Sequence, residues 1–345
     1  MFTRIQIDGL RGIANADLDG LAPVTLLLGS NGSGKSTVLE AIGVACANNS
    51  AEATFQALAK REWLGLEGMK YWFTKDDGTS TITAYEGRKE PAVTSSLLLG
   101  APLPLELEEE ARKAGAKGDI EMFSGSFFLA MIDEEGELYK ERSDKPFKLF
   151  SLESLSVDRP VGARRRYVGK RFSSALRTAL KELKLKPYYD EVVQYLRILR
   201  PNLSSIENLA VGDRDEPFVI ENNPRIVYPL SYAGDGFRRI MLIAGALAGT
   251  KGGVVAIDEP EAYAHPRLFA VLAQMTRRAC VEGTQIVMAT HSLEFVKATL
   301  TEFENDTDKI AVIGLSNERG SLNSVVITGP NACRRVVELG DDLRL

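Results

Sequence analysis

The stretch from Gly29 to Thr37, GSNGSGKST, decides the fold of this chain. It fits the phosphate-loop pattern G-x-x-x-x-G-K-[ST]. An apolar run, 24–28, precedes it and a helix-forming run, 36–47, follows it, which predicts a strand, a loop and a helix. Backbone N–H groups in such a loop, together with the positive end of the helix, converge on phosphate oxygens. We therefore expect nucleotide contacts from Gly29, Ser30, Asn31, Gly32, Ser33, Gly34, Lys35, Ser36 and Thr37, with Lys35 adding a point charge and the Ser36 hydroxyl reaching Mg²⁺.

Composition bounds the class of protein. The 345 residues are 44% hydrophobic and 26% charged, as in ordinary globular proteins. The net charge of −5 means that nucleic acid could bind only through a local basic patch. Cys46, Cys280 and Cys333 match no metal-ligand spacing, and the longest apolar run, 241–249, is far too short to cross a bilayer. We expect a cytoplasmic protein with reduced cysteines and no membrane segment.

A second chemical element follows the apolar run 254–257, which ends in Asp258 and Glu259. Such a run predicts a buried parallel strand whose carboxyl end delivers two carboxylates where ligands of open α/β sheets lie. Read as a Walker B element, Asp258 holds Mg²⁺ and Glu259 orients and deprotonates the attacking water. A plain strand cap is the alternative, but the phosphate loop upstream favours the catalytic interpretation.

Two more segments complete the predicted site. The run 285–290 reads as another buried strand, and it ends in His291, which we assign to sensing the γ-phosphate, before Ser292, a good helix N-cap. The segment 231–239, SYAGDGFRR, opens an apolar helix and suits a second anion contact. Its predicted nucleotide-binding residues are Ser231, Gly234, Asp235 and Gly236. His265 is interpreted as a capping or dimer-contact residue.

The order GSNGSGKST, SYAGDGFRR, VVAIDEPE and ATHS resembles the ABC-type ATPase heads of the SMC, RecF and OLD group, most closely the OLD-like ATPases. The opening RIQIDGLRGI and the ending KIAVIGL, then SVVITG, are also similar. The resemblance implies an α/β P-loop NTPase fold: an ABC-ATPase-like head with an antiparallel β subdomain and a short helical arm. It also implies ATP and Mg²⁺ as cofactors, and it adds Arg11 to the nucleotide-binding residues.

The same resemblance implies two heads that close over two nucleotides, as a homodimer or a larger assembly. The closure would gate DNA recognition or a separately encoded effector in phage defence. A RecF-like or SMC-like ATPase of DNA repair is the alternative. No glutamine-loop residue can be assigned, and only 345 − 291 = 54 residues follow His291, too few for the Toprim nuclease of OLD proteins. Asp306-Thr307-Asp308 is a literal D-x-D, but it precedes a strand and is read as a polar loop.

Three segments organise the predicted chain. Residues 1–156 form an N-terminal lobe with two antiparallel hairpins, 70–74 with 79–85 and 119–132 with 137–141, beginning with an edge strand at 2–8. Residues 157–201 form a basic root and helical arm, and 202–345 form the C-terminal lobe. The root holds six Arg or Lys. Its candidate nucleic-acid contacts are Arg164, Arg165, Arg166, Lys170 and Arg171, with a solvated or acidic-partner-facing loop as the alternative.

Other P-loop classes fit less well. Residues 74–77, TKDD, match the guanine-reading pattern [NT]-K-x-D of GTPases, but they lie upstream of the Walker B run instead of after it. The segment 231–239 is a poor match to the transporter signature. A binding module without hydrolysis would lack the glutamate after Asp258. An ATPase is therefore the expected class.

Overall fold

The computed structural model describes residues 1–46, 79–87, 91–99, 121–132, 138–155, 165–168, 188–211, 214–262 and 264–343. Within these ranges the strands form a twelve-stranded sheet, in the order β6-β7-β5-β4-β1-β2-β15-β14-β3-β13-β12-β8, and a three-stranded sheet, in the order β11-β10-β9. The large sheet is mixed: one half is mostly parallel and carries the predicted site, and the other is antiparallel. The expected α/β head with an antiparallel β subdomain is confirmed.

The site-bearing half contains the apolar runs picked from the sequence. Strand β3 (Val24–Leu28) pairs in parallel with β13 (Gln285–Ala289) on one side and β14 (Ile310–Glu318) on the other. Strand β12 (Val254–Asp258) pairs in parallel with β13 and with β8 (Arg165–Val168). Because these strands run in one direction, their carboxyl ends meet at one edge of the sheet.

The antiparallel half begins at the N-terminus. Strand β1 (Arg4–Leu10) lies between β2 (Ile13–Asp19) and β4 (Thr79–Tyr85), so the expectation of an edge strand is wrong: both of its backbone edges are paired. The pairing predicted between 119–132 and 137–141 is confirmed where these strands are described, since Ile132 lies opposite Leu138. The other predicted pairing, of 79–85 with 70–74, is wrong, because β4 pairs with β1 on one edge and with β5 on the other. Residues 70–74 themselves lie outside the described residues. The remaining strands are β5 (Pro91–Leu99), β6 (Glu121–Ile132), β7 (Leu138–Leu155) and β15 (Ser321–Thr328).

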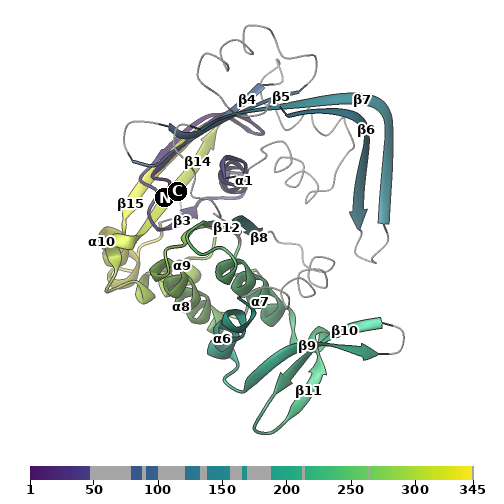
Figure 1. The fold of residues 1–345 in the computed structure, drawn as a ribbon. Coiled ribbons are helices and arrows are strands. Elements are labelled where there is room, and N and C mark those ends of the chain that lie inside the picture. Colours follow the sequence, from purple (N-terminus) through teal and green to yellow (C-terminus); the bar gives the residue numbers. More distant parts are fainter. Residues whose placement is uncertain are drawn as a thin grey trace.

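Helices cover both faces of the sheet (Figure 1). Helix α1 (Lys35–Ala45) packs on one face with Leu27, and the second layer packs on the other face with Leu26 and Leu28. This alternation is what a strand buried on both sides requires. The second layer comprises α6 (Tyr189–Leu199), α7 (Asp235–Ala248), α8 (Arg267–Val281) and α9 (Leu293–Glu302).

Helix α6 differs from its expected place in an arm. Its apolar stripe, with Val192, Tyr195 and Leu196 fully or almost fully buried, joins the core beneath α7 and α8. An amphipathic helix is stabilised by burying that stripe, so this part of the segment 157–201 packs with the head. The segment boundaries at 156 and 201 stay predictions.

The smaller sheet follows α6 and projects from the helical layer (Figure 1). It consists of β9 (Leu203–Val211), β10 (Arg214–Glu221) and β11 (Ile226–Pro229), and it leads into a 3₁₀ turn, η2 (Leu230–Ala233). The C-terminal part also contains a 3₁₀ turn, η3 (Thr307–Lys309), a short α-helix, α10 (Gly329–Ala332), and a π-helix, η4 (Cys333–Glu338). Among the described helices, none has the length and apolar character that crossing a bilayer requires.

Candidate functional site

The phosphate loop connects β3 to α1 and needs glycine for steric reasons. Gly29 has φ = 154°, and a Cβ there would lie 2.4 Å from the carbonyl oxygen of Leu315 and 2.5 Å from Ser33 Oγ. Gly34 has φ = 93°, a left-handed conformation that disfavours any side chain. Gly34 is also the N-cap of α1 and supplies no side-chain hydrogen bond to the helix. An anion therefore suits the N–H groups of this helix end.

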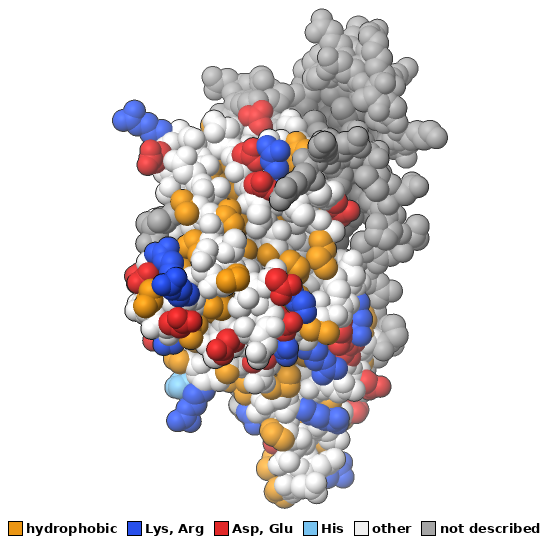
Figure 2. All heavy atoms as spheres, turned by 90° about the vertical axis from the view of Figure 1, so that its left-hand side faces the viewer, with side chains coloured by type: hydrophobic (Ala, Val, Ile, Leu, Met, Phe, Trp, Pro, Cys, Tyr) orange, Lys and Arg blue, Asp and Glu red, His pale blue; other side chains and the backbone are white. Residues whose placement is uncertain are grey.

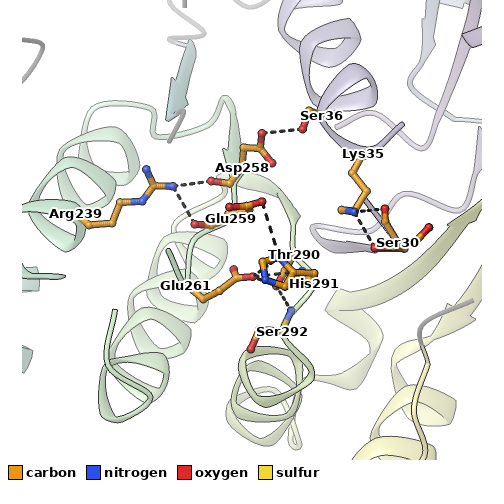
Figure 3. Close-up of polar contacts among 11 residues, drawn as sticks. Ser30, Lys35, Ser36, Arg239, Asp258, Glu259, Glu261, Thr290, His291 and Ser292 are labelled. Carbon is orange, nitrogen blue, oxygen red and sulfur yellow. Dashed lines mark hydrogen bonds and ion pairs between the residues drawn. The ribbon is translucent and has the colours of Figure 1, made fainter. Parts of the chain in front are cut away.

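Lys35 lies within the loop. Its Nζ donates to the carbonyl oxygens of Gly29 at 2.8 Å and Ser30 at 2.9 Å, and the side chain is buried. The ammonium thus lies inside the ring of backbone that would surround a phosphate group (Figure 3). The nine residues from Gly29 to Thr37 occupy the strand, loop and helix context that the sequence predicted.

The two predicted metal ligands meet. Ser36 Oγ, at the start of α1, donates a hydrogen bond of 2.8 Å to Asp258 Oδ2, at the end of β12. These residues are 222 positions apart in the chain, and Asp258 is only 7% exposed. A hydroxyl and a carboxylate at one point form the oxygen donor set that Mg²⁺ takes beside a nucleotide phosphate. The donor set fits the ion.

Glu259 follows in a tight turn. Its φ of 48° is unusual for a side chain other than glycine, and its N–H donates to the carbonyl oxygen of Ala289 at 2.8 Å. That bond continues the pairing of β12 with β13 by one residue, and the left-handed turn starts where it ends. Residues held in such backbone regions concentrate at functional sites.

Arg239 was not among the predicted site residues, although it closes the quoted segment SYAGDGFRR. It is fully buried, and its Nη2 donates to the carbonyl oxygens of Asp258 at 2.6 Å and Glu259 at 3.0 Å. The guanidinium therefore braces the left-handed turn from α7 (Figure 3). No local sequence signal separates Arg239 from its neighbour Arg238, because both stand in the first turns of the same helix.

His291 and a second glutamate complete the cluster. The His291 ring is 57% exposed, with Nδ1 at 3.9 Å from Glu259 Oε1 and 3.6 Å from Glu261 Oε1. Glu261 was also missed, although it is the last letter of the quoted DEPE. Ser292 caps α9 as predicted, because its side chain accepts from the N–H of Phe295 at 3.2 Å. The structure thus brings Ser36, Asp258, Glu259 and His291 to one edge of the sheet.

The signature segment forms η2 and the start of α7. Ser231 and Gly234 are exposed, and Tyr232 is 80% exposed. Gly234 is the N-cap of α7, with φ = 79° and no side-chain capping bond. Asp235 and Gly236 begin the helix. This helix end therefore presents backbone N–H groups without a side-chain cap.

The other predicted residues lie at different places. Arg11 Nη1 is 2.5 Å from Glu40 Oε2, so Arg11 lies against α1. His265 Nδ1 accepts from the N–H of Arg267 at 3.2 Å, which agrees with a capping role. Asp306 accepts hydrogen bonds from Lys309 and Arg277, and these two cations lower the pKa of its carboxyl group.

The basic root is described only in part. Arg165 and Arg166 belong to β8, opposite Val254 and Val255 of β12, whereas Arg164, Lys170 and Arg171 lie outside the described residues. On the face drawn in Figure 2, acidic and basic side chains are interspersed. A nucleic-acid contact through the root stays a prediction.

Comparisons with known proteins agree with this geometry. A protein-family model described as "AAA domain, putative AbiEii toxin, Type IV TA system" matches residues 70–297, and a second AAA-domain model matches residues 4–96. An uncharacterized protein of Methanocaldococcus jannaschii is 29% identical over 112 residues, which cover 32% of this chain and 98% of that protein.

Solved structures show the fold. The head domain of Smc with an extended coiled coil, bound to the C-terminal domain of ScpA from Pyrococcus furiosus, is 11% identical with a TM-score of 0.51 over 99% of both chains. An Smc head bound to the C-winged helix domain of ScpA is 12% identical with a TM-score of 0.50, covering 95% of this chain and 98% of that one. The chain therefore belongs to the AAA-domain family described as putative AbiEii toxin, Type IV TA system, and it has the P-loop ATPase fold of an Smc head.

Proposed function

We propose that this protein hydrolyses ATP with Mg²⁺ and that Glu259 activates the attacking water. The observation that carries the proposal is the hydrogen bond between Ser36 and Asp258, because it brings two side chains that are 222 positions apart into one oxygen donor set. Mg²⁺ held there would neutralise charge on the phosphates during transfer. Lys35 and the loop amides would bind the β- and γ-phosphates, and the exposed His291 ring would contact the γ-phosphate.

A head-to-tail homodimer would complete each site. The exposed Ser231 and Gly234 lie at the uncapped start of α7, which favours an anion. In a twofold dimer, each chain would offer this helix end to the γ-phosphate held by the other chain, so two identical composite sites form together. ATP binding would then drive association by mass action.

In biological terms, we propose a cytoplasmic ATPase that couples its nucleotide state to DNA recognition or to a separately encoded effector in anti-phage defence, the role that the resemblance to OLD-like ATPases implies. The family description, which names a putative AbiEii toxin of a type IV system, supports a defence setting. The likeness to Smc heads concerns the fold alone and lends a DNA-repair role no specific support. A toxin or nuclease gene beside this one would favour defence, and a replication or repair neighbourhood would contradict it.

Turnover of ATP by the purified chain tests the enzymatic proposal. Hydrolysis should require Mg²⁺ and stop with EDTA, and Asp258→Asn should lower it by about 10²-fold or more, because a buried metal ligand is removed. Asp308→Asn, an exposed aspartate far along the chain, is the matched control and should be as active as the wild type. Equal activity in both variants would contradict the assigned metal site.

A further inference from the structure

Glu261 lies in the turn that follows the catalytic strand, and its side chain is almost fully buried. It is 8% exposed, and its Oε1 accepts hydrogen bonds from Thr290 Oγ1 at 2.6 Å and from the backbone N–H of His291 at 3.3 Å. Its other oxygen, Oε2, is buried with no hydrogen-bond partner among the described residues. A carboxylate buried with one oxygen unpartnered reduces stability, so this residue requires a reason other than stability.

Glu261 accepts hydrogen bonds from the segment Thr290 to Ser292, which we call the His loop. Thr290 Oγ1 donates to Glu261 and accepts from the N–H of Ser292 at 3.0 Å. Ser292 in turn caps α9. One chain of hydrogen bonds therefore runs from Glu261 through the His loop into a helix. Thr290 is also held by its N–H bond to Leu27 and Ser292 by α9, so moving Glu261 would chiefly free the backbone of His291.

The His291 ring has no comparable anchor to these carboxylates. Its Nδ1 lies 3.6 Å from Glu261 and 3.9 Å from Glu259, and both separations exceed hydrogen-bond length. The ring's place therefore depends on the backbone that carries it. That backbone is tied to the Walker B turn at two points, by the N–H of Glu259 bonded to Ala289 and by Glu261 bonded to the loop.

We propose that Glu261 is a positioning residue: it fixes His291 relative to Glu259 by accepting hydrogen bonds from the His loop (Figure 3). It touches no reacting atom in this assignment and acts through His291. The effect on turnover rests on the proposed ATPase function, whereas the effect on the placement of His291 does not.

The kinetic test uses Glu261→Ala, Glu261→Gln, His291→Ala and the double variant Glu261→Ala with His291→Ala. Glu261→Ala should lower kcat by about 10²-fold, as His291→Ala does, with KM for ATP changed less than about threefold. The double variant should be no slower than His291→Ala, because both changes remove the same contribution. Glu261→Gln keeps an acceptor oxygen and should recover most of the rate. Glu294→Ala, exposed in the first turn of α9, is the matched control.

Three kinetic results would overturn the proposal. The first is a decrease in kcat of the double variant that equals the product of the two single decreases. The second is a raised KM with unchanged kcat in Glu261→Ala. The third is a Glu261→Gln variant as slow as Glu261→Ala, because the acceptor oxygen would then be irrelevant.

A second readout needs no turnover. The chain contains only two histidines, so ¹³C labelling of the imidazole Cε1 gives two resonances, and His291→Ala identifies which belongs to His291. Glu261→Ala should move the His291 resonance and leave that of His265 unchanged, while Glu261→Gln should move it much less. An unmoved His291 resonance in Glu261→Ala would overturn the proposal. Absence of wild-type turnover would instead contradict the ATPase proposal and leave this test intact.

Discussion

Arg239 Nη2 donates a hydrogen bond of 2.6 Å to the carbonyl oxygen of Asp258. Arg239 belongs to the helix that the signature segment opens, and Asp258 ends the strand that leads to the predicted catalytic carboxylates. The bond therefore connects the part of the head predicted to face a partner's nucleotide with the part predicted to hold its own Mg²⁺. A second bond, to the carbonyl oxygen of Glu259, extends the connection to the left-handed turn.

Removing this guanidinium should weaken both the fold and the turn. Arg239→Met leaves two carbonyl groups without their donor, and we expect a decrease of about 2 to 4 kcal/mol in the free energy of unfolding, measured in urea. Turnover should fall at temperatures where the variant is still folded. Arg239→Lys can restore one bond and should be destabilised less. Arg238→Met, at the adjacent and partly exposed position, is the control, and an equal decrease there would contradict a specific role for Arg239.

Variants at Glu259 and Lys35 should affect ATP turnover and ATP affinity differently. Glu259→Gln keeps the size of the side chain but cannot accept the proton of water, so we expect normal ATP affinity with turnover lowered by about 10² to 10⁴-fold. Lys35→Ala should instead abolish binding, because the variant has no point charge inside the loop. Isothermal titration with ATP and a phosphate-release assay measure the two effects. Unchanged turnover in Glu259→Gln would remove this residue from the mechanism.

Mixing two inactive variants tests the composite site. Lys35→Ala should destroy nucleotide binding on its own chain, and Ser231→Arg should block the signature of its own chain. A mixed dimer then retains one intact site only if the signature acts on the partner's nucleotide. We expect partial recovery of turnover on mixing. Mixed dimers that form, shown by a tag pull-down, but stay inactive would favour hydrolysis within one subunit.

Asp306 should serve stability and not catalysis. Lys309 and Arg277 hold its pKa below the usual 3.8, so the folded state favours the ionised carboxylate. The stabilisation is present above the unfolded pKa and is lost as pH falls through the lower folded value. Asp306→Asn should thus lower Tm at pH 7. Its difference from the wild type should begin to shrink near pH 4 and vanish only below the lowered pKa of the folded state. If Asp306→Asn turns over ATP as fast as the wild type, residues 306–308 act as a polar loop. A decrease in its turnover with an unchanged Tm would contradict that interpretation.

The basic root can be tested by salt dependence. Replacing Arg164, Arg165 and Arg166 by Glu should weaken DNA binding and flatten the plot of log K against log salt by about one unit for each phosphate that the protein no longer neutralises. Replacing three cationic side chains of α8 and α9, Arg267, Arg278 and Lys297, by Glu controls for net charge. An unchanged slope in the root variant would show that this segment faces something else.

The sequence alone determined the parts whose function follows from a local pattern. The loop GSNGSGKST, the carboxylates after an apolar run and the histidine before a helix cap each carry their own geometric context. These patterns predicted β3, α1, β12, β13 and the start of α9, with ends within two residues of those observed. A run such as 254–257 is typical of a strand buried on both faces, so its carboxyl end is where a ligand is expected.

Only the tertiary structure decided which distant groups support that site. Nothing local distinguishes Arg239 from Arg238, or shows that Glu261 reaches the His loop 29 residues later. The place of β1 between two strands, and of α6 in the core, likewise depended on partners from far along the chain. Local patterns specify which surfaces must be buried or bonded. Which partner meets each of them is decided by the packing of the whole chain, because burial energy depends on area and not on sequence distance.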